Sequence, residues 1–351
     1  MNIRAVILCS ALLLTAPLFA REKTDVIVMK NGDRLTCQVK ELGAGVLYVS
    51  LDYALGTISL QWSEVAHLES NQLFIVQMDD GSVYEGTLST VETPGGRPVK
   101  IQVAESPEEK VVIDGPQIVG MYETSKEFWQ RFNGSLNSGT TYSKGNQSTQ
   151  YNLSAQVAYK REDWGGQASF NSTLSASTGA TTSTRNQIAL GSQRRLPRKN
   201  YFYFGRAGFL QSAEQGIDLQ ASLSGGIGHY LKDSNDARIS LLGGLTVQRT
   251  YYERSVVPLD PQNILAALIG ADLYLFKFDK TNLSVSATLL PALSEPGRVF
   301  FGTNAAYYIK LFGSLSWNIS FYGNWDNRPP PGLSGSDYGA TSGVGYTFGN
   351  N

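Results

Sequence analysis

The segment LSWNISFYGNW, residues 315–325, alternates strictly, with apolar residues or glycine at its odd positions and Ser, Asn or Tyr at its even positions. The same alternation occurs in YNLSAQVAY at residues 151–159 and in YGATSGVGYTF at residues 338–348. Successive side chains of a β-strand point to opposite faces, so each segment predicts a strand with one apolar and one polar face. Aromatic strand ends and a polar face with few charges are typical of a transmembrane β-barrel. A soluble sandwich also alternates, but we would expect more charge on its polar face.

About twelve segments with this pattern follow one another in the second part of the chain. They are expected at residues 128–142, 149–161, 164–177, 183–196, 199–212, 216–231, 237–252, 262–277, 281–293, 298–311, 314–327 and 336–348. An even number suits a bacterial single-chain barrel. The connections after the even segments are short, and short turns of such barrels face the periplasm. We therefore predict both ends of the barrel on the periplasmic side.

The composition of the 351 residues already narrows the class of protein. Charged residues are 17% of the chain, against about 25% in typical soluble domains, and it has 36 Gly and 18 Tyr. Many Gly and aromatic residues favour strands and turns over helices. The net charge of −1 excludes a uniformly basic nucleic-acid binder, so no nucleic-acid partner is expected.

The first twenty residues have the features of a secretory signal peptide. Arg4 supplies the positive charge near the N-terminus, and residues 5–14 are apolar. Residues 18–20, Leu-Phe-Ala, form a cleavage site that ends in a small residue, so cleavage is expected before Arg21. The apolar run is too short to span a bilayer. Cys9 lies inside this segment, so the mature chain keeps only Cys37 and cannot form an internal disulfide. With no other long apolar run, any membrane domain must be a β-barrel.

The exported chain divides into two parts of opposite charge. Residues 25–122 contain 14 Asp/Glu and 6 Lys/Arg, whereas residues 123–351 contain 15 Asp/Glu and 20 Lys/Arg. The composition of the expected strands also differs: those of the first part are rich in Val, Ile and Leu, and those of the second part are rich in Ser, Thr, Asn and Gln. We therefore expect a periplasmic module over residues 21–122 and an outer-membrane β-barrel over residues 127–351.

The module contains an internal duplication. VIVMKNGDRL at residues 26–35 is similar to FIVQMDDGSV at residues 74–83, and each copy turns at Asn-Gly or Asp-Gly, which suits a tight hairpin. The period of about 49 residues predicts two small SH3-like β-barrels, over about 25–70 and 73–122. Two copies are too few for a solenoid.

The second part of the chain resembles a known family through an ordered set of short stretches. These are GN at 145–146, ST at 148–149, DL at 218–219, GIGHY at 226–230, GG at 243–244, YYE at 251–253, RPP at 328–330 and GVGYTF at 343–348. In this order they resemble the salt-induced outer membrane proteins, catalogued as domain of unknown function 481, over about residues 128–348. The resemblance implies a barrel in the outer membrane of a Gram-negative cell, surrounded by lipid, whose C-terminal strand is recognised by the barrel assembly machinery. It brings no catalytic residues.

Charged residues on the polar faces form a candidate lumen. Strand parity assigns to it Arg131, Arg185, Arg195, Arg206, Asp218, Asp272 and Arg298. Each would cost about 2–4 kcal/mol if it faced lipid near the midplane. Two interpretations remain open: an Arg/Asp/Gln network that fills the barrel, or a narrow conduit that mildly prefers anions.

Basic residues also gather in the short turns and predict a contact between the two parts. The candidate periplasmic rim comprises Arg161, Arg194, Arg198, Lys199, Lys232, Lys280 and Lys310. The linker from Tyr122 to Phe128 is short, so we expect the acidic module to dock on this rim and cover the barrel mouth. Exposed ion pairs contribute only about 0–1 kcal/mol each, so the docking is expected to be loose and sensitive to salt. The alternative is that these charges are solvated or contact lipid phosphates.

The sequence offers little for catalysis or metal binding. An outer-membrane phospholipase needs a His beside a Ser, but His67 lies in the module, and Ser222 and Ser224 have the opposite parity to His229. Two scattered His and one Cys give no metal-ligand spacing. The segment GGIG at 225–228 lies inside a strand, so it is no dinucleotide loop. We expect no cofactor and no metal.

The sequence thus predicts an all-β, non-enzymatic outer-membrane protein, either structural or a narrow solute or ion channel. The alternative is a module that binds a periplasmic protein or the cell wall and is anchored by a closed barrel. A lipolytic outer-membrane enzyme is the third interpretation.

Overall fold

The computed structural model describes most of the chain outside its first residues. The described residues are 23–91, 99–106, 108–125, 128–143, 148–161, 164–177, 183–196, 200–213, 216–252, 260–278, 280–312, 315–329 and 335–346. The predicted signal peptide at residues 1–20 lies outside them. No helix among the described residues is long and apolar enough to cross a membrane.

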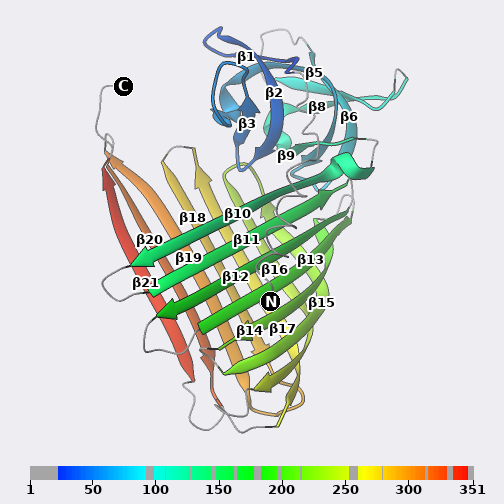
Figure 1. Cartoon of the computed structure of the whole chain (residues 1–351). Coiled ribbons are helices and arrows are strands. Elements are labelled where there is room, and N and C mark those ends of the chain that lie inside the picture. The colour runs from blue at the N-terminus through cyan, green and yellow to red at the C-terminus, as the bar shows by residue number, and fades with distance from the viewer. Residues whose placement is uncertain are drawn as a thin grey trace.

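The described chain is all-β and forms two sheets, one of nine strands and one of twelve (Figure 1). The nine-stranded module comprises β1 (Asp25–Met29), β2 (Arg34–Gly43), β3 (Val46–Ser50), β4 (Ile58–Gln61), β5 (Val65–Met78), β6 (Val83–Val91), β7 (Lys100–Ala104), β8 (Lys110–Asp114) and β9 (Ile118–Glu123). Short 3-10 helices, η2 (Trp62–Glu64) and η3 (Gly115–Gln117), precede β5 and β9.

The duplicated sequence corresponds to a repeated order of strand pairing. In the first half β1 pairs with β2 and with the start of β5, and in the second half the end of β5 pairs with β6 and β9. The predicted hairpin turns lie between the first two strands of each half, where Gly32 and Gly81 have φ of 93° and 84°. In the first turn the Asn31 side chain accepts a hydrogen bond from the Asp33 amide, at 3.0 Å.

The two halves do not form separate barrels. Strand β5 runs from Val65 to Met78 across the expected boundary, and β9 of the second half pairs with β2 of the first. As a result β1, β2, β9 and β5 close into one ring of four strands. One hydrophobic core fills the module and takes fully buried side chains from both halves, including Ile27, Phe74 and Met121. Because each half completes the core of the other, the module is a single folding unit.

The second sheet is an antiparallel meander in which each strand pairs with the next along the chain. Its strands are β10 (Phe132–Ser143), β11 (Ser148–Lys160), β12 (Trp164–Ser177), β13 (Ser183–Leu196), β14 (Tyr201–Ser212), β15 (Ile217–Asp233), β16 (Ala237–Tyr252), β17 (Gln262–Lys277), β18 (Thr281–Pro291), β19 (Val299–Phe312), β20 (Leu315–Asp326) and β21 (Ser336–Tyr346). The predicted number of strands is confirmed.

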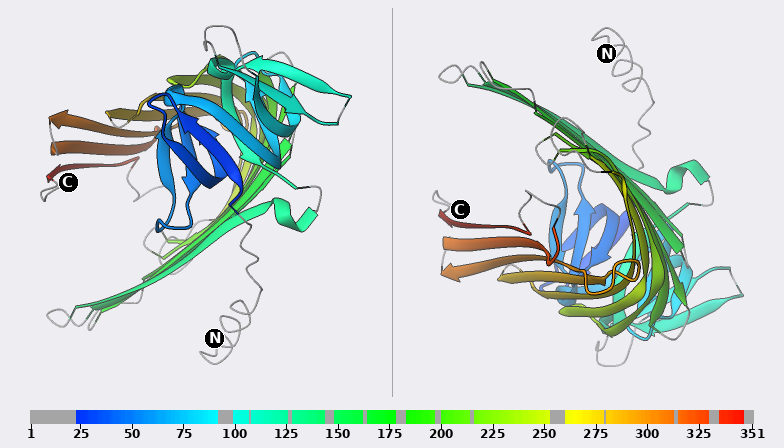
Figure 2. Two further views of the ribbon diagram at one scale, coloured as in Figure 1. Left: turned by 90° about the horizontal axis from the view of Figure 1, so that it is seen from above. Right: turned by 90° about the horizontal axis from the view of Figure 1, so that it is seen from below.

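The twelve strands form a strongly curved sheet that stays open along one side. Figure 2 shows the edge strands β10 and β21 apart from each other, and no pairing joins them within the described residues. The structure therefore has the predicted strands and curvature, but not the predicted closure into a barrel.

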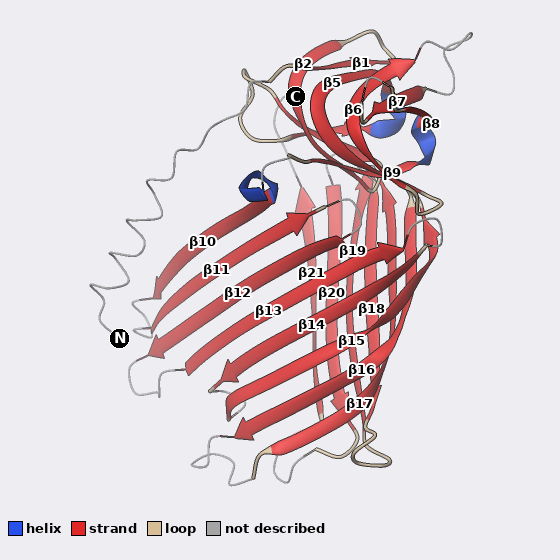
Figure 3. Cartoon of the chain, turned by 90° about the vertical axis from the view of Figure 1, so that its right-hand side faces the viewer, coloured by secondary structure: helices blue, strands red, loops and turns tan. Residues whose placement is uncertain are grey.

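The module lies at one end of the twelve-stranded sheet, where β10 begins and β21 ends (Figures 1 and 3). Strands β11, β13, β15, β17 and β19 end here, and we call this the module end. Another 3-10 helix, η4 (Phe128–Arg131), leads from the module into β10.

Candidate functional site at the module end of the sheet

The convex face of the twelve-stranded sheet is apolar. Exposed side chains on it include Leu153, Val157, Leu245, Trp317 and Val344. Among the described strand residues, the charged side chains that the register places on this face lie near strand ends: Arg194, Lys232 and Lys277 at the module end and Arg249 near the other. The middle of this face is therefore free of formal charge.

The concave face is mixed in character. Strand register places Arg185, Arg195, Arg206 and Asp272 of the candidate lumen on this face, and Asp272 interacts electrostatically with Arg206. Asp218 lies where the register shifts between Ile217 and Leu219, so strand pairing does not assign it to a face. Apolar side chains also pack there. They form two buried clusters, one of Phe202, Phe204, Tyr230, Leu242 and Leu268 and one of Ile264, Ala266 and Ala292. Part of the space beneath the module is thus filled by side chains.

Arg131 has a different position from the one expected. It belongs to η4 rather than to a strand, and its Nε donates to the Ser125 carbonyl at 2.5 Å. Its Nη1 also lies 3.4 Å from the Tyr159 hydroxyl. Arg131 therefore fixes the junction between the module and β10.

Two asparagines of the sheet turns bind the backbone of the module. Asn235, between β15 and β16, donates through Nδ2 to the Ile118 carbonyl at 2.9 Å and lies 3.3 Å from the Pro116 carbonyl. Asn200, before β14, donates to the Asp79 carbonyl at 3.1 Å. Asn200 has φ of 51°, a left-handed conformation that Asn adopts more readily than most residues. Both side chains insert into the module and fix its position on the sheet.

Lys160 makes the ionic contact between the two parts. Its ammonium group lies 3.2 Å from the Glu41 carboxylate and 3.7 Å from the centre of the Tyr122 ring. Burial raises the pKa of the Tyr122 hydroxyl, and the charge of Glu41 adds to this, while Arg238 and Arg195 oppose it. The Tyr122 hydroxyl therefore stays protonated at neutral pH and can donate a hydrogen bond.

A buried ion cluster lies beneath this contact. Asp233 is fully shielded from solvent and binds two guanidinium groups, that of Arg195 at 2.9 Å and that of Arg238 at 2.7 Å. The Tyr230 ring lies 4.7 Å from the Arg195 guanidinium carbon and accepts a hydrogen bond at its hydroxyl from Gln193, at 2.8 Å. One carboxylate thus faces two arginines, the buried Arg195 and the partly exposed Arg238, and a net positive charge remains.

These groups surround a cavity of about 290 Å³ between the module and the concave face. Its polar lining residues are Gln77, Tyr122, Lys160, Arg161, Gln167, Gln193, Arg195, Arg206, Tyr230 and Arg238. A second cavity of about 650 Å³ lies at the same end, between Trp62 and Gly115 of the module and Phe276 and Lys277 of β17. The docking interface is therefore only partly filled by protein atoms.

The predicted periplasmic rim contributes less to docking than expected. Arg161 and Lys280 line the two cavities, and Lys310 donates its backbone amide to the Lys280 carbonyl at 2.7 Å. Arg194 and Lys232 point to the convex face. Arg198 and Lys199 lie outside the described residues. Within the described residues, the ion pair between the two parts uses Lys160, a further basic residue beside these turns, and Asn200 and Asn235 donate hydrogen bonds to the module.

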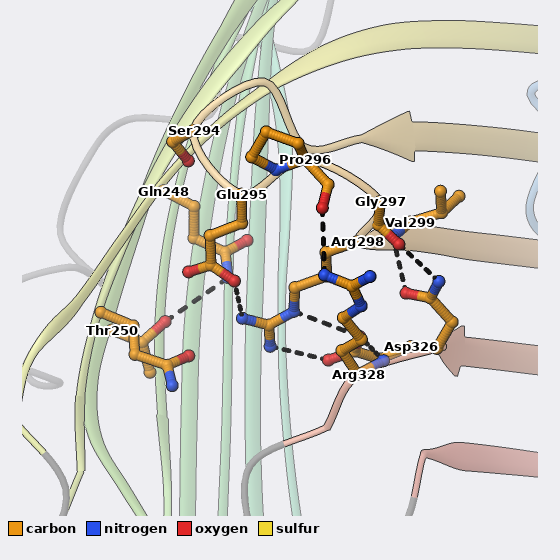
Figure 4. Close-up of polar contacts among 12 residues, drawn as sticks. Gln248, Thr250, Ser294, Glu295, Pro296, Gly297, Arg298, Val299, Asp326 and Arg328 are labelled. Atoms are coloured by element: carbon orange, nitrogen blue, oxygen red, sulfur yellow. Dashed lines mark hydrogen bonds and ion pairs between the residues drawn. The ribbon is translucent and has the colours of Figure 1, made fainter.

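The other end of the sheet is held by a second buried arginine (Figure 4). Arg298 is 4% exposed, and its guanidinium binds Glu295 at 2.9 Å and Asp326 at 2.8 Å. The loop before it folds onto β17, since the Leu293 amide donates to the Leu265 carbonyl at 2.7 Å. Arg328 donates to the Pro296 carbonyl at 3.0 Å. The candidate lumen residue Arg298 is thus a structural anchor for this loop.

The histidines lie apart from the other candidate catalytic residues. His229 stacks on Tyr201 at 4.2 Å on the convex face, whereas Ser224 contacts Thr246 on the concave face. His67 lies in the module, 3.8 Å from Glu69. The described residues contain no group of three His, Cys, Asp or Glu that could bind a metal ion.

A family comparison completes the description of the sheet. The family model of DUF481, a protein of unknown function, matches residues 136–348, from within β10 to just beyond β21. The chain belongs to this family. The resemblance inferred from the short stretches is confirmed, and the DUF481 region corresponds to the curved sheet, with the module outside it. No curated protein matches the chain.

The residues that join the two parts of this DUF481 protein were not predicted from its sequence. Asn200 and Asn235 stand in turns, where Asn is common for local reasons, so the sequence does not indicate a longer-range contact. Tyr122 is the penultimate residue of the last module strand, and its position in the sequence indicates only the boundary of the module. A signal was present in the turn after β15, where SND at 234–236 places a side-chain amide at the tip.

Proposed function

We propose that this DUF481 protein is a non-enzymatic outer-membrane protein whose curved sheet closes into a β-barrel in the bilayer. The observation that supports this proposal is the apolar convex face, whose formal charges lie near the strand ends. Contiguous exposed apolar patches larger than a few hundred Å² are unusual on a soluble monomer. A lipid environment stabilises such a face, and the predicted signal peptide supplies export.

Closure requires that β10 and β21 pair with each other. Within the described residues each of these strands pairs with a single neighbouring strand, and a strand edge left without pairing costs several kcal/mol per backbone group in a hydrocarbon environment. They run in opposite directions, so an antiparallel pairing would leave no free edge. In the proposed protein the acidic module stays in the periplasm.

The closed barrel would be narrow and covered at its periplasmic mouth. The module docks through Asn200, Asn235 and Lys160, and buried side chains occupy part of the concave side. Passage of ions therefore requires displacement of the module. The lining of the mouth favours anions, since it contains Lys160, Arg161, Arg195, Arg206 and Arg238.

A second function is favoured by the charge of the module. Within the described residues, Glu41 is the module acid that forms an ion pair with the sheet. Exposed acids such as Glu105, Glu108 and Glu109 are available for a periplasmic protein or cell-wall partner, with the barrel as an anchor.

Single-channel recording of the full chain in planar bilayers separates these two functions. The comparison uses the wild type and the double variant Lys160→Gln/Asn235→Ala, which removes contacts between the module and the sheet. A covered conduit predicts rare, anion-selective openings in the wild type and frequent ones in the variant. A silent wild type and a silent variant would support the anchored module instead, and failure to insert into bilayers would refute both.

A further inference from the structure

The cavity of about 290 Å³ at the module end has an unusual balance of charge. Five cationic side chains line it, and among the residues that the structure describes no acidic one does. Three acids face these cations: Glu41 pairs with Lys160, Asp233 binds Arg195 and Arg238, and Asp272 interacts electrostatically with Arg206. Five cations against three acids leave the described part of the cavity with an excess of positive charge.

Arg195 has an unused hydrogen-bond donor. The residue is 9% exposed, its Nη2 donates to Asp233 at 2.9 Å, and its Nη1 is buried without a hydrogen-bond partner. A buried N–H group without a partner is destabilising, and more so when it is charged. Arg195 lines the cavity, so an acceptor that reached Nη1 from there would remove this cost.

The neutral side chains of the cavity supply further donors. The Tyr230 hydroxyl oxygen already accepts a hydrogen bond from Gln193, so its own proton remains free for an acceptor. The Tyr122 hydroxyl keeps its proton because burial raises its pKa. Gln77 and Gln167 contribute amide groups from opposite sides of the cavity. The donors thus come from the module and the sheet together.

We infer that this cavity binds a small oxyanion of the phosphate or sulfate type. Arginine guanidinium groups bind such anions with charge-assisted and often bidentate hydrogen bonds. The volume lies at the lower end of the range of about 300–1,000 Å³ for small-molecule sites, which suits an anion rather than a larger organic solute. The bound anion would bridge Arg195 and Arg206 of the sheet to Tyr122 of the module. This inference does not depend on the membrane role proposed above.

An alternative is that the cations only hold the module in place by general electrostatics. In that case every basic residue of the concave face would contribute to anion affinity by a similar, salt-screened amount. Arg185 provides the matched control, because it is an exposed arginine on the same face whose strand position is at the opposite end, away from the cavity.

The test is isothermal titration calorimetry of the detergent-purified full chain with inorganic phosphate and, separately, with sulfate. We expect saturable binding of one anion per chain in the wild type, at least a tenfold weaker affinity in Arg206→Gln, and a change of less than twofold in Arg185→Gln. A thermal melt of each variant checks folding, and phosphate should raise the melting temperature of the wild type and of Arg185→Gln more than that of Arg206→Gln.

A short-chain phosphatidic acid titrated in the same detergent distinguishes a lipid headgroup from free phosphate as the source. Tighter binding of this lipid than of inorganic phosphate would assign the site to headgroups, and the reverse would assign it to free anions. The absence of saturable binding of all three ligands in the folded wild type would overturn the inference. Equal losses in Arg206→Gln and Arg185→Gln would also overturn it.

Discussion

The module and the twelve-stranded sheet are both built from alternating strands, but they place their apolar faces oppositely. In the module the apolar faces meet inside a closed ring, where Ile27, Val39 and Phe74 are fully buried. In the sheet the apolar face is convex and exposed, and charged residues such as Arg206 and Asp272 lie on the concave face. Alternation therefore predicts a strand, while the composition of the polar face indicates which side meets water.

The largest effect is expected in the module core. Phe74→Ala removes a fully buried ring from the strand that both halves share, which should cost about 3–5 kcal/mol of unfolding free energy. The fully exposed Leu55 is the control, and Leu55→Ala should change stability by less than about 0.5 kcal/mol. Hydrogen exchange of the module amides measures both. If only one half of the module lost protection in Phe74→Ala, the two halves would be independent after all.

The next effect tests the two faces of the sheet. Ile319→Arg places a charge on the convex face and should destabilise the protein in a bilayer by about 2–4 kcal/mol if this residue lies near the midplane. Asn318→Arg, one residue earlier, turns to the concave face and should be tolerated. Urea unfolding in lipid vesicles compares the two variants. Equal damage from both would contradict the assignment of the faces.

A smaller effect is expected where two strands of the sheet approach closely. A Cβ atom on Gly244 would collide with the Gly225 carbonyl oxygen of the neighbouring strand, whereas one on Gly243 would meet nothing within 4 Å. Gly244→Ala should therefore cost about 1–3 kcal/mol by overpacking. Gly243→Ala should be nearly neutral. The melting temperatures of the two variants in detergent provide the comparison, and matching values would refute the close packing of β15 and β16.

The smallest effect concerns the contact between the two regions. Asn235→Ala removes the hydrogen bond to the Ile118 carbonyl and should weaken docking by about 1 kcal/mol at any salt concentration. Lys160→Gln removes a half-exposed ion pair, so its smaller effect should vanish near 1 M salt. Hydrogen exchange around β9 follows docking. Loss of both effects at high salt would contradict this assignment and would support the purely electrostatic docking predicted from the sequence.

The strands of the sheet could be predicted from the sequence because strong alternation and turn residues act locally. The expected segment 262–277 coincides with β17, and the expected segment 183–196 coincides with β13. The duplication at residues 26–35 and 74–83 was also visible. The shared core was not, because the pairing of β9 with β2 joins residues about eighty positions apart.

The candidate site could be predicted only in part. The alternation of side chains along each strand predicted the faces of Arg195, Arg206 and Asp272, because it depends only on positions within that strand. The burial of Asp233 between Arg195 and Arg238 depends on where separate turns meet, and local sequence carries no such information. For the same reason, the basic residues of the turns predicted docking through surface charges, whereas the structure uses the hydrogen bonds of Asn200 and Asn235.

The most direct test of the central proposal is collision accessibility of spin labels along β20, Leu315–Asp326, in the reconstituted Cys37→Ser chain. Oxygen concentrates in lipid, and a nickel chelate stays in water. If the convex face is embedded in lipid, we expect labels at Trp317, Ile319 and Phe321 to collide mainly with oxygen. Labels at Asn318 and Ser320 should collide mainly with the nickel chelate. Equal access of the nickel chelate to both sets would contradict a convex face embedded in the membrane.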